Sequence, residues 1–285
     1  MLGFNALLRN VVSIVPLFVF GAAQAAADAA IDVGVDLGVR YQAQQYSDNN
    51  ASLWSTTLSP YVAYEDWIVG VDVPFQRVEG VFNFRGSAQQ ARNCDLLSSG
   101  AQLPEKLEPF RDRLLARCTA LTEENNTEEG VGDVNIYASF GKSFAHTSGY
   151  WLWTLGYDGD NADAERQLGS GTRDVYLDFV VIKDHDYFSL LFLVGYNYLV
   201  GGVNKDLYDS YSYIGAEIST QKDKPWLMGI GVDYQYDNVE PIVSARLFGQ
   251  WQASESVVFK VQVKGYEHSV YYPSSSVDAS LLFSF

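Results

Sequence analysis

Hydrophobic and polar residues alternate along most of the chain with a period of two residues. In segment 31–41 the odd positions carry Ile, Val, Leu and Tyr, whereas the even positions carry Asp, Gly and Arg. This is the period of a β-strand that has one apolar and one polar face. The pattern recurs, less cleanly in the second, seventh and eighth cases, in twelve segments: 31–41, 53–64, 69–76, 133–140, 151–158, 175–181, 188–199, 211–219, 226–235, 242–252, 257–264 and 277–285.

The connections between these segments alternate between short and long. The short ones are 65–66, 145–149, 183–186, 221–224 and 253–256. The longer ones are 47–52, 83–132, 159–173, 202–206, 237–241 and 267–275. Outer-membrane barrels have an even strand number, short periplasmic turns and longer outer loops. The sequence therefore predicts an all-β fold: a twelve-stranded antiparallel up-and-down transmembrane β-barrel over residues 30–285, with 83–132 as a long extracellular loop.

The apolar face of these strands fits lipid better than a protein core. If this face were packed inside a soluble protein, the charged residues of strand after strand would be left buried, or exposed in register. In a membrane the apolar face contacts lipid, and a closed barrel satisfies all backbone hydrogen bonds. Aromatic residues near strand ends, such as Trp54, Tyr64, Trp226 and Trp251, fit interfacial girdles. A soluble β-sandwich is the alternative.

The N-terminus carries an export signal. Arg9 precedes an apolar run over 11–22, and small residues follow it, so we expect residues 1–25 to be a signal peptide, with cleavage after Ala25 or Ala27. The run is too short for a membrane-spanning helix. The expected location is the bacterial outer membrane of a Gram-negative cell, where lipids surround the barrel. A net charge of −16 argues against nucleic acid as a partner.

Cys94 and Cys118 are the only cysteines, and both fall in the long loop 83–132 of an exported chain. A disulfide between them is the natural expectation. Two cysteines without a nearby histidine make a poor metal site, so neither a metal nor a cofactor is expected. Within the same loop, apolar residues recur at helical spacing over 107–121, which indicates either an inward constriction or a surface cap.

Strand parity places a set of charged residues on the inward face. The candidate selectivity residues lining the lumen are Asp36, Arg40, Asp72, Asp178, Glu217, Asp233, Arg246, Lys260, Lys264 and Asp278. One interpretation is a transverse electric field across a constriction that selects polar solutes. The other is ion pairing that neutralises a plugged interior.

Some outer-membrane barrels are phospholipases that use Ser and His, so the histidines of this chain bear on an enzymatic role. His146 and His185 fall in expected turns, and only His268 lies beside serines, the first being Ser269. Adjacent residues of a strand point to opposite faces, so His268 and Ser269 cannot pair directly. We therefore expect no enzyme and no catalytic residues, and a lipid-modifying enzyme remains the alternative function.

One stretch carries a family resemblance. Gly130-Val131-Gly132-Asp133 opens a strand, Gly159-Asp160 follows, and then comes Leu168-Gly169-Ser170-Gly171-Thr172-Arg173-Asp174. This order resembles the outer-membrane family associated with the meta-pathway of phenol degradation, over 130–202. The resemblance implies a transporter for small, often hydrophobic or aromatic compounds. The C-terminal Phe285 is similarly typical of chains that the barrel-assembly machinery delivers.

The function expected from the sequence is passive passage of small-molecule solutes through an outer-membrane channel. The inward charges and the predicted closure support it. A closed structural or adhesive barrel, whose outer loops would carry the function, is a further alternative.

Overall fold

The computed structural model describes residues 31–45, 50–80, 127–145, 147–162, 168–203, 205, 209–220, 225–236, 241–254, 256–267 and 274–285. The expected signal peptide, Cys94, Cys118, the helical spacing over 107–121, His146, His268 and Ser269 lie outside these ranges. Within the described ranges, no helix has the length and apolar composition needed to span a membrane.

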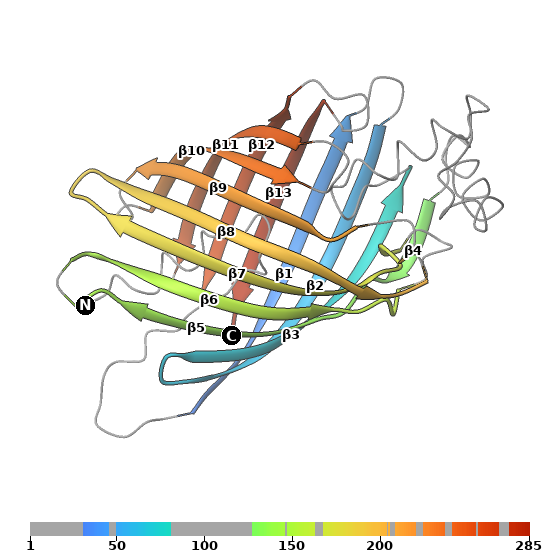
Figure 1. The fold of residues 1–285 in the computed structure, drawn as a ribbon, viewed down its shortest axis with the longest axis horizontal. Helices are drawn as coiled ribbons and strands as arrows, with labels where there is room; N and C mark the ends of the chain where they lie inside the picture. Colours follow the sequence, from blue (N-terminus) through green and yellow to red (C-terminus); the bar gives the residue numbers. More distant parts are fainter. Residues whose placement is uncertain are drawn as a thin grey trace.

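The strands form one antiparallel sheet that closes on itself, because β1 pairs with β13 and with β2, and β2 also pairs with β3. Figure 1 shows the resulting barrel. The strands are β1 (Asp32–Gln45), β2 (Asn50–Tyr64), β3 (Trp67–Glu79), β4 (Thr127–Val131), β5 (Asn135–Ser143), β6 (Gly149–Asp158), β7 (Arg173–Asp184), β8 (Phe188–Gly201), β9 (Tyr211–Thr220), β10 (Trp226–Tyr236), β11 (Pro241–Ser254), β12 (Val257–Tyr266) and β13 (Ser275–Ser284).

β4 and β5 are two pieces of one barrel strand. Both pair with β3, β4 along 75–79 and β5 along 67–72, and the ladder is interrupted at 132–134. The barrel therefore has the twelve strands predicted from alternation. Antiparallel neighbours joined by short loops need no crossover, so pairing follows chain order around the ring.

One boundary differs from the prediction. The loop expected over 83–132 extends too far, because residues 127–131 form β4. The sequence Thr-Glu-Glu-Gly-Val has no apolar alternation, so this strand gave no signal. Its pairing uses backbone hydrogen bonds and charge: the Arg77 guanidinium lies 3.5 Å from the Glu129 carboxylate across the ladder.

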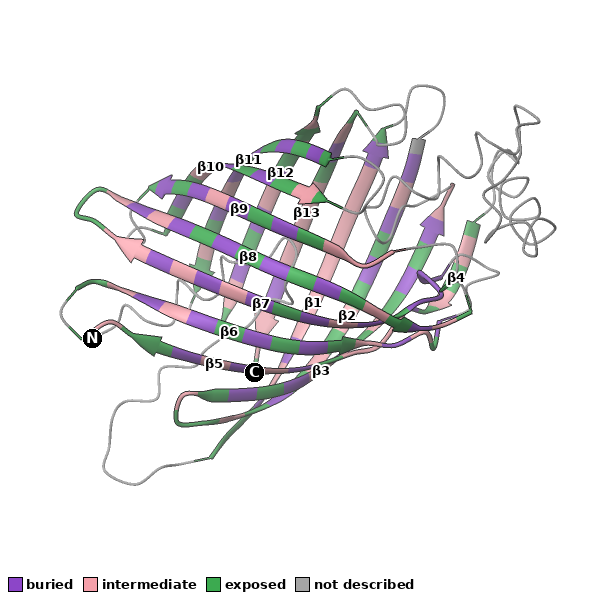
Figure 2. Ribbon diagram, viewed as in Figure 1, coloured by how far each residue is buried: buried purple, intermediate pink, exposed green. Residues whose placement is uncertain are grey.

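The two faces of the sheet differ as the alternation predicted. On β10, Met228 and Ile230 are exposed, whereas Leu227, Gly231 and Asp233 are buried. The alternation of exposed and buried residues is visible strand by strand in Figure 2. Exposed apolar side chains therefore lie on the outer face, and the buried side chains lie on the inner face.

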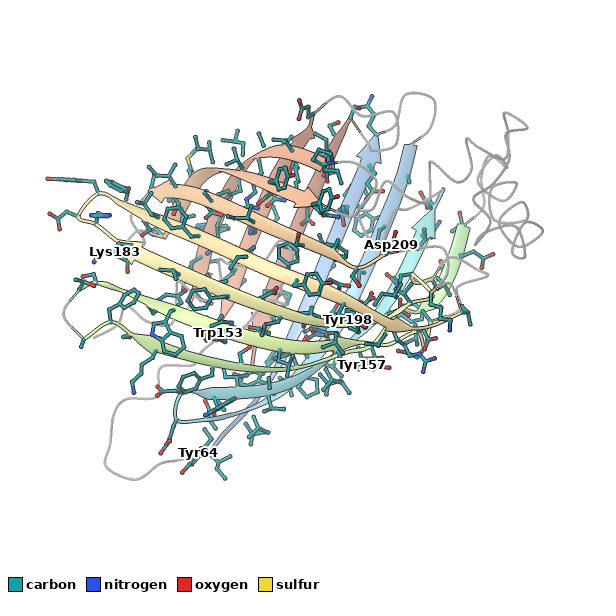
Figure 3. The ribbon with its side chains drawn as sticks, viewed as in Figure 1. Tyr64, Trp153, Tyr157, Lys183, Tyr198 and Asp209 are labelled. Carbon is teal, nitrogen blue, oxygen red and sulfur yellow. The ribbon has the colours of Figure 1, made fainter. Side chains whose placement is uncertain are left out.

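Aromatic residues on the outer face contact one another across neighbouring strands. Near the short turns, which we call the turn end, ring centroids lie 4.9 Å apart for Trp67 and Phe140 and 5.7 Å apart for Trp226 and Trp251. Near the longer connections, the loop end, the Tyr41 and Trp54 rings lie 4.7 Å apart. Such pairs stabilise the sheet beyond the area they bury. Exposed aromatic side chains labelled in Figure 3 are Tyr64, Trp153, Tyr157 and Tyr198.

Candidate functional site on the inner face of the barrel

The inner face carries aromatic rings that lie against glycines of the neighbouring strand. Five cross-strand pairs place a glycine directly opposite an aromatic residue: Gly34–Tyr61, Gly70–Tyr137, Gly156–Tyr176, Gly195–Tyr213 and Gly229–Phe248. A Cβ atom at any of these glycines would lie only 2.0 to 2.4 Å from the nearest ring atom. Each ring thus occupies the space above a glycine, along the wall of the barrel. Rings in this position fill less of the centre than rings that project from the wall.

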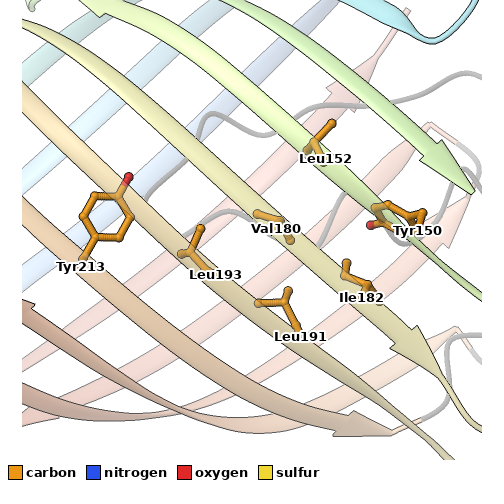
Figure 4. Close-up of a cluster of buried hydrophobic side chains, with 7 residues drawn as sticks. All are labelled: Tyr150, Leu152, Val180, Ile182, Leu191, Leu193 and Tyr213. Carbon is orange, nitrogen blue, oxygen red and sulfur yellow. The ribbon is translucent and has the colours of Figure 1, made fainter.

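The inner face is apolar near the turn end of β6, β7 and β8, and the apolar surface extends to Tyr213 of β9, which lies nearer the loop end. A buried cluster there contains Tyr150, Leu152, Val180, Ile182, Leu191, Leu193 and Tyr213, shown in Figure 4. We call these residues the apolar base. Sequence reasoning missed it, although a signal existed: the apolar runs 179–182 and 190–194 are continuous, because both faces of these strands are apolar. The same continuity blurred the alternation of segment 188–199.

The cationic residues predicted for the inner face lie on β1, β11 and β12. The Arg246 guanidinium contacts the Asp233 carboxylate at 2.7 Å and the Glu217 carboxylate at 3.1 Å, and the Lys264 ammonium lies 3.2 Å from Asp233. On the adjoining strands, Arg40 pairs with Asp278. Lys260 is buried and lies 5.5 Å from the ring centroid of Phe248. We call this region the cationic wall.

Two of the remaining predicted acidic residues, Asp72 and Asp178, accept hydrogen bonds from amide and hydroxyl groups rather than from cations. Asp72 of β3 accepts a hydrogen bond from the Asn135 amide at 3.1 Å. Asp178 of β7 accepts one from the Tyr213 hydroxyl. Both carboxylates are buried, as is Asp36 of β1. We call Asp72, Asp178 and their partners the hydroxyl-lined wall.

The sequence motifs behind the family resemblance meet at the loop end. The Asp133 carboxylate, in the break between β4 and β5, accepts hydrogen bonds from the backbone N–H of Ala162 at 3.1 Å and of Ser170 at 2.9 Å. Gln76 donates to the Leu168 carbonyl at 2.5 Å, and Leu168 is buried in a cluster with Leu53. The connection between β6 and β7 is therefore held against the inner face of β2 and β3. Spacing alone did not reveal this contact.

Of the three histidines in the sequence, the described ranges contain His185. His185 is exposed in the turn after β7, where its ring stacks on Phe188 at 4.6 Å. A catalytic histidine needs a nucleophile within hydrogen-bond reach and a group that orients it. In the described part of the chain, no group of three or more His, Cys, Asp or Glu residues is arranged to hold a metal ion.

Comparison with known proteins gives a likeness in structure only. No family model matches the chain, and no curated protein matches its sequence. The crystal structure of an outer-membrane channel from Pseudomonas putida F1 superposes with a TM-score of 0.60 at 12% identity, over 90% of this chain and 97% of that one. KdgM porin in complex with disordered oligogalacturonate gives 0.49 at 8% identity, over 88% and 99%. The fold is thus that of an outer-membrane β-barrel.

Proposed function

We propose that the chain is a passive channel for small molecules in the bacterial outer membrane. The observation that carries this proposal is the inner face, where buried charges stand on a closed wall whose aromatic rings lie along it. The likeness in fold to an outer-membrane channel from Pseudomonas putida F1 supports it. The exposed apolar outer face fits a lipid environment.

The proposal includes the route by which the chain reaches the membrane. Residues 1–25 act as the signal peptide, and the barrel-assembly machinery recognises the C-terminal residue, Phe285. The Phe285 side chain is 79% exposed, while its backbone N–H donates to the Val35 carbonyl of the neighbouring strand at 3.1 Å. An exposed terminal aromatic ring on a paired strand is available for such recognition. In the same proposal, Cys94 and Cys118 form a disulfide in the long connection between β3 and β4.

The charged residues of the inner face act as the selectivity filter. The cationic wall combines Arg40, Arg246, Lys260 and Lys264 with Glu217, Asp233 and Asp278. The hydroxyl-lined wall contributes Asp72 and Asp178, and Asp36 lies on β1. Charges on the cationic wall and on the hydroxyl-lined wall orient a dipolar solute as it passes between them. Their pairing within each wall limits the field without removing it.

The finer proposal concerns the solutes. We expect the channel to favour solutes with an apolar body, including hydrophobic or aromatic compounds. The apolar base and the rings along the wall offer such solutes apolar contacts. Ligand sites are commonly apolar with a few polar groups that fix orientation. The inner face combines both kinds of surface.

The test is single-channel recording on the refolded mature chain in planar bilayers, together with vesicle swelling in sugar and aromatic solutes. We expect discrete conductance steps and faster swelling than in protein-free vesicles. Ser280→Trp, on the inner face of β13, is expected to lower the conductance, whereas Ala279→Trp, its neighbour on the outer face, is the matched control. Absence of conductance would favour a closed structural or adhesive barrel. Phospholipid hydrolysis, with or without Ca²⁺, would favour a lipid-modifying enzyme.

A further inference from the structure

Lys260 is the cation of the inner face that is left without an ion pair among the described residues. Its side chain is buried, with 7% of the residue exposed. Glu217 and Asp278 act on it electrostatically, but each is held by an arginine, Glu217 by Arg246 at 3.1 Å and Asp278 by Arg40. A buried charge without a partner is costly, so buried lysines are normally paired.

The carboxylates near Lys260 are engaged by other cations. In the described part of the cationic wall, four cations, Arg40, Arg246, Lys260 and Lys264, face three carboxylates, those of Glu217, Asp233 and Asp278. The three carboxylates are all engaged by Arg40, Arg246 or Lys264. Among the described residues, Lys260 is therefore the cation of this wall that has no ion pair.

A second unsatisfied group lies beside this cation. Gln250 of β11 is directly opposite Lys260 of β12 in the antiparallel ladder. Gln250 is buried, and its Oε1 atom has no hydrogen-bond donor among the described residues. A carboxamide offers both an acceptor and two donor hydrogens, and rotation exchanges the two ends. It can therefore donate to a bound anion or accept from a hydroxyl on the same ligand.

Apolar side chains complete the surroundings. The Phe248 ring lies 5.5 Å from the Lys260 ammonium. Toward the turn end, Val258, two residues before Lys260 on the same face, packs with Leu282 across the β12–β13 ladder. The cation thus stands beside apolar surface on two sides. A ligand that fits has one anionic end and a compact hydrocarbon body.

We propose that Lys260, Gln250 and Phe248, with Val258 and Leu282, form a binding site for a small monocarboxylate that carries an apolar body. The carboxylate pairs with the Lys260 ammonium and takes a hydrogen bond from the Gln250 amide, while the body contacts Phe248, Val258 and Leu282. The ligand carboxylate supplies the ion pair that Lys260 lacks among the described residues. This inference rests on the proposed function, because the ligand reaches the site as a solute of the channel.

The test measures equilibrium binding of hexanoate by saturation-transfer NMR on the refolded chain in amphipol, so it does not depend on conduction. Lys260→Met, which keeps the unbranched stem, is expected to weaken hexanoate about tenfold, because it removes a charge-assisted hydrogen bond. Lys260→Arg keeps most of the affinity. Lys264→Met is the matched comparison: the same charge is removed from the same face of β12, but from a lysine that is paired with Asp233. We expect it to change the affinity less than about twofold, since screening weakens its interaction with a more distant carboxylate.

Two further ligands, acetate and hexanol, test which parts of hexanoate the site recognises. Acetate, which has the charge without the body, is expected to bind about tenfold more weakly than hexanoate, from several lost CH₂ contacts. Hexanol is expected to bind equally to the original chain and to Lys260→Met.

Gln250→Leu leaves every ion pair in place and is expected to weaken hexanoate binding about threefold, which keeps the test decisive if Lys260→Met does not refold. Equal losses at Lys260 and Lys264, acetate as tight as hexanoate, or no saturable binding would each overturn the site. A channel that conducts but does not bind hexanoate would leave the proposed function intact.

Discussion

The two walls of the barrel interior satisfy their buried carboxylates in different ways. On the cationic wall, Arg246 binds Asp233 and Glu217 at 2.7 and 3.1 Å, and Arg40 binds Asp278. On the hydroxyl-lined wall, Asp178 has the Tyr213 hydroxyl and Asp72 has the Asn135 amide. A guanidinium brings a full opposite charge, whereas a hydroxyl brings only a dipole. The first wall is thus a network that depends on single cations, and the second is a series of separate bonds.

The two walls differ in how much a single substitution should destabilise the fold. Removing one partner of a buried ion pair leaves an uncompensated charge, which costs more than the pair contributes. Removing a hydroxyl that donates to a carboxylate costs that hydrogen bond and leaves one buried acceptor without its donor. Arg246 serves two carboxylates at once. One substitution there should therefore cost more than any substitution on the other wall.

The largest expected effect follows from Arg246→Met. Asp233 would keep only Lys264, at 3.2 Å, and Glu217 would lose its ion pair. We expect the free energy of unfolding to fall by about 3 to 5 kcal/mol, measured by urea titration of the barrel in vesicles.

The control for that experiment is an exposed cation on the same fold. Arg77 contacts Glu79 at 3.0 Å, but the side chains are 50% and 46% exposed. Arg77→Met should cost less than about 1 kcal/mol, because exposed pairs are screened by water. Equal losses for the two arginines would show that burial does not distinguish them, and the contrast between the walls would be wrong.

A smaller effect is expected at Tyr213 on the hydroxyl-lined wall. Tyr213→Phe keeps the ring above Gly195 and removes only the hydroxyl that donates to Asp178. The loss should be about 1.5 to 3 kcal/mol, since the acceptor is a carboxylate.

Tyr176→Phe is the matched variant within the same wall. Its hydroxyl donates to the neutral Asn135 side chain at 3.0 Å, and its ring also lies above a glycine, Gly156. We expect about 1 kcal/mol, measured by the same urea titration. A larger loss at Tyr176 than at Tyr213 would mean that ring packing, rather than the charge of the acceptor, governs this wall.

Some features of this fold could be predicted from the sequence and others could not. Alternation predicted the twelve strands, because the side-chain period of a strand is fixed. It missed β4, whose residues 127–131 show no apolar alternation. It also missed the apolar base, since residues such as Leu191 and Leu193 are apolar on the face expected to be polar.

The sequence did not predict which side chains of neighbouring strands contact one another. Parity places Asp233 and Arg246 on one face, but only the register, in which Gly231 lies opposite Arg246, decides that the two side chains meet diagonally. The register depends on turn geometry and on packing along the ladder rather than on either residue alone. The same holds for the Asp133 contacts with Ala162 and Ser170, which join residues of different connections.

A small effect in free energy is also expected for ion selectivity, where the two walls should act in opposite directions. Replacing Lys260 and Lys264 by Glu should shift the channel toward cations, and Asp72→Asn with Asp178→Asn should shift it toward anions. Each shift in permeability ratio should stay below about tenfold, or 1.4 kcal/mol, because the remaining charges of each wall persist. The measurement is the reversal potential in a salt gradient across a planar bilayer. Lys260→Gln with Lys264→Gln should fall between the original chain and the Glu variant, which separates a charge effect from a change of shape. Unchanged selectivity in all three variants would mean that ions do not pass along these walls, and the pairing of Arg246 with Asp233 and Glu217 would then serve stability alone.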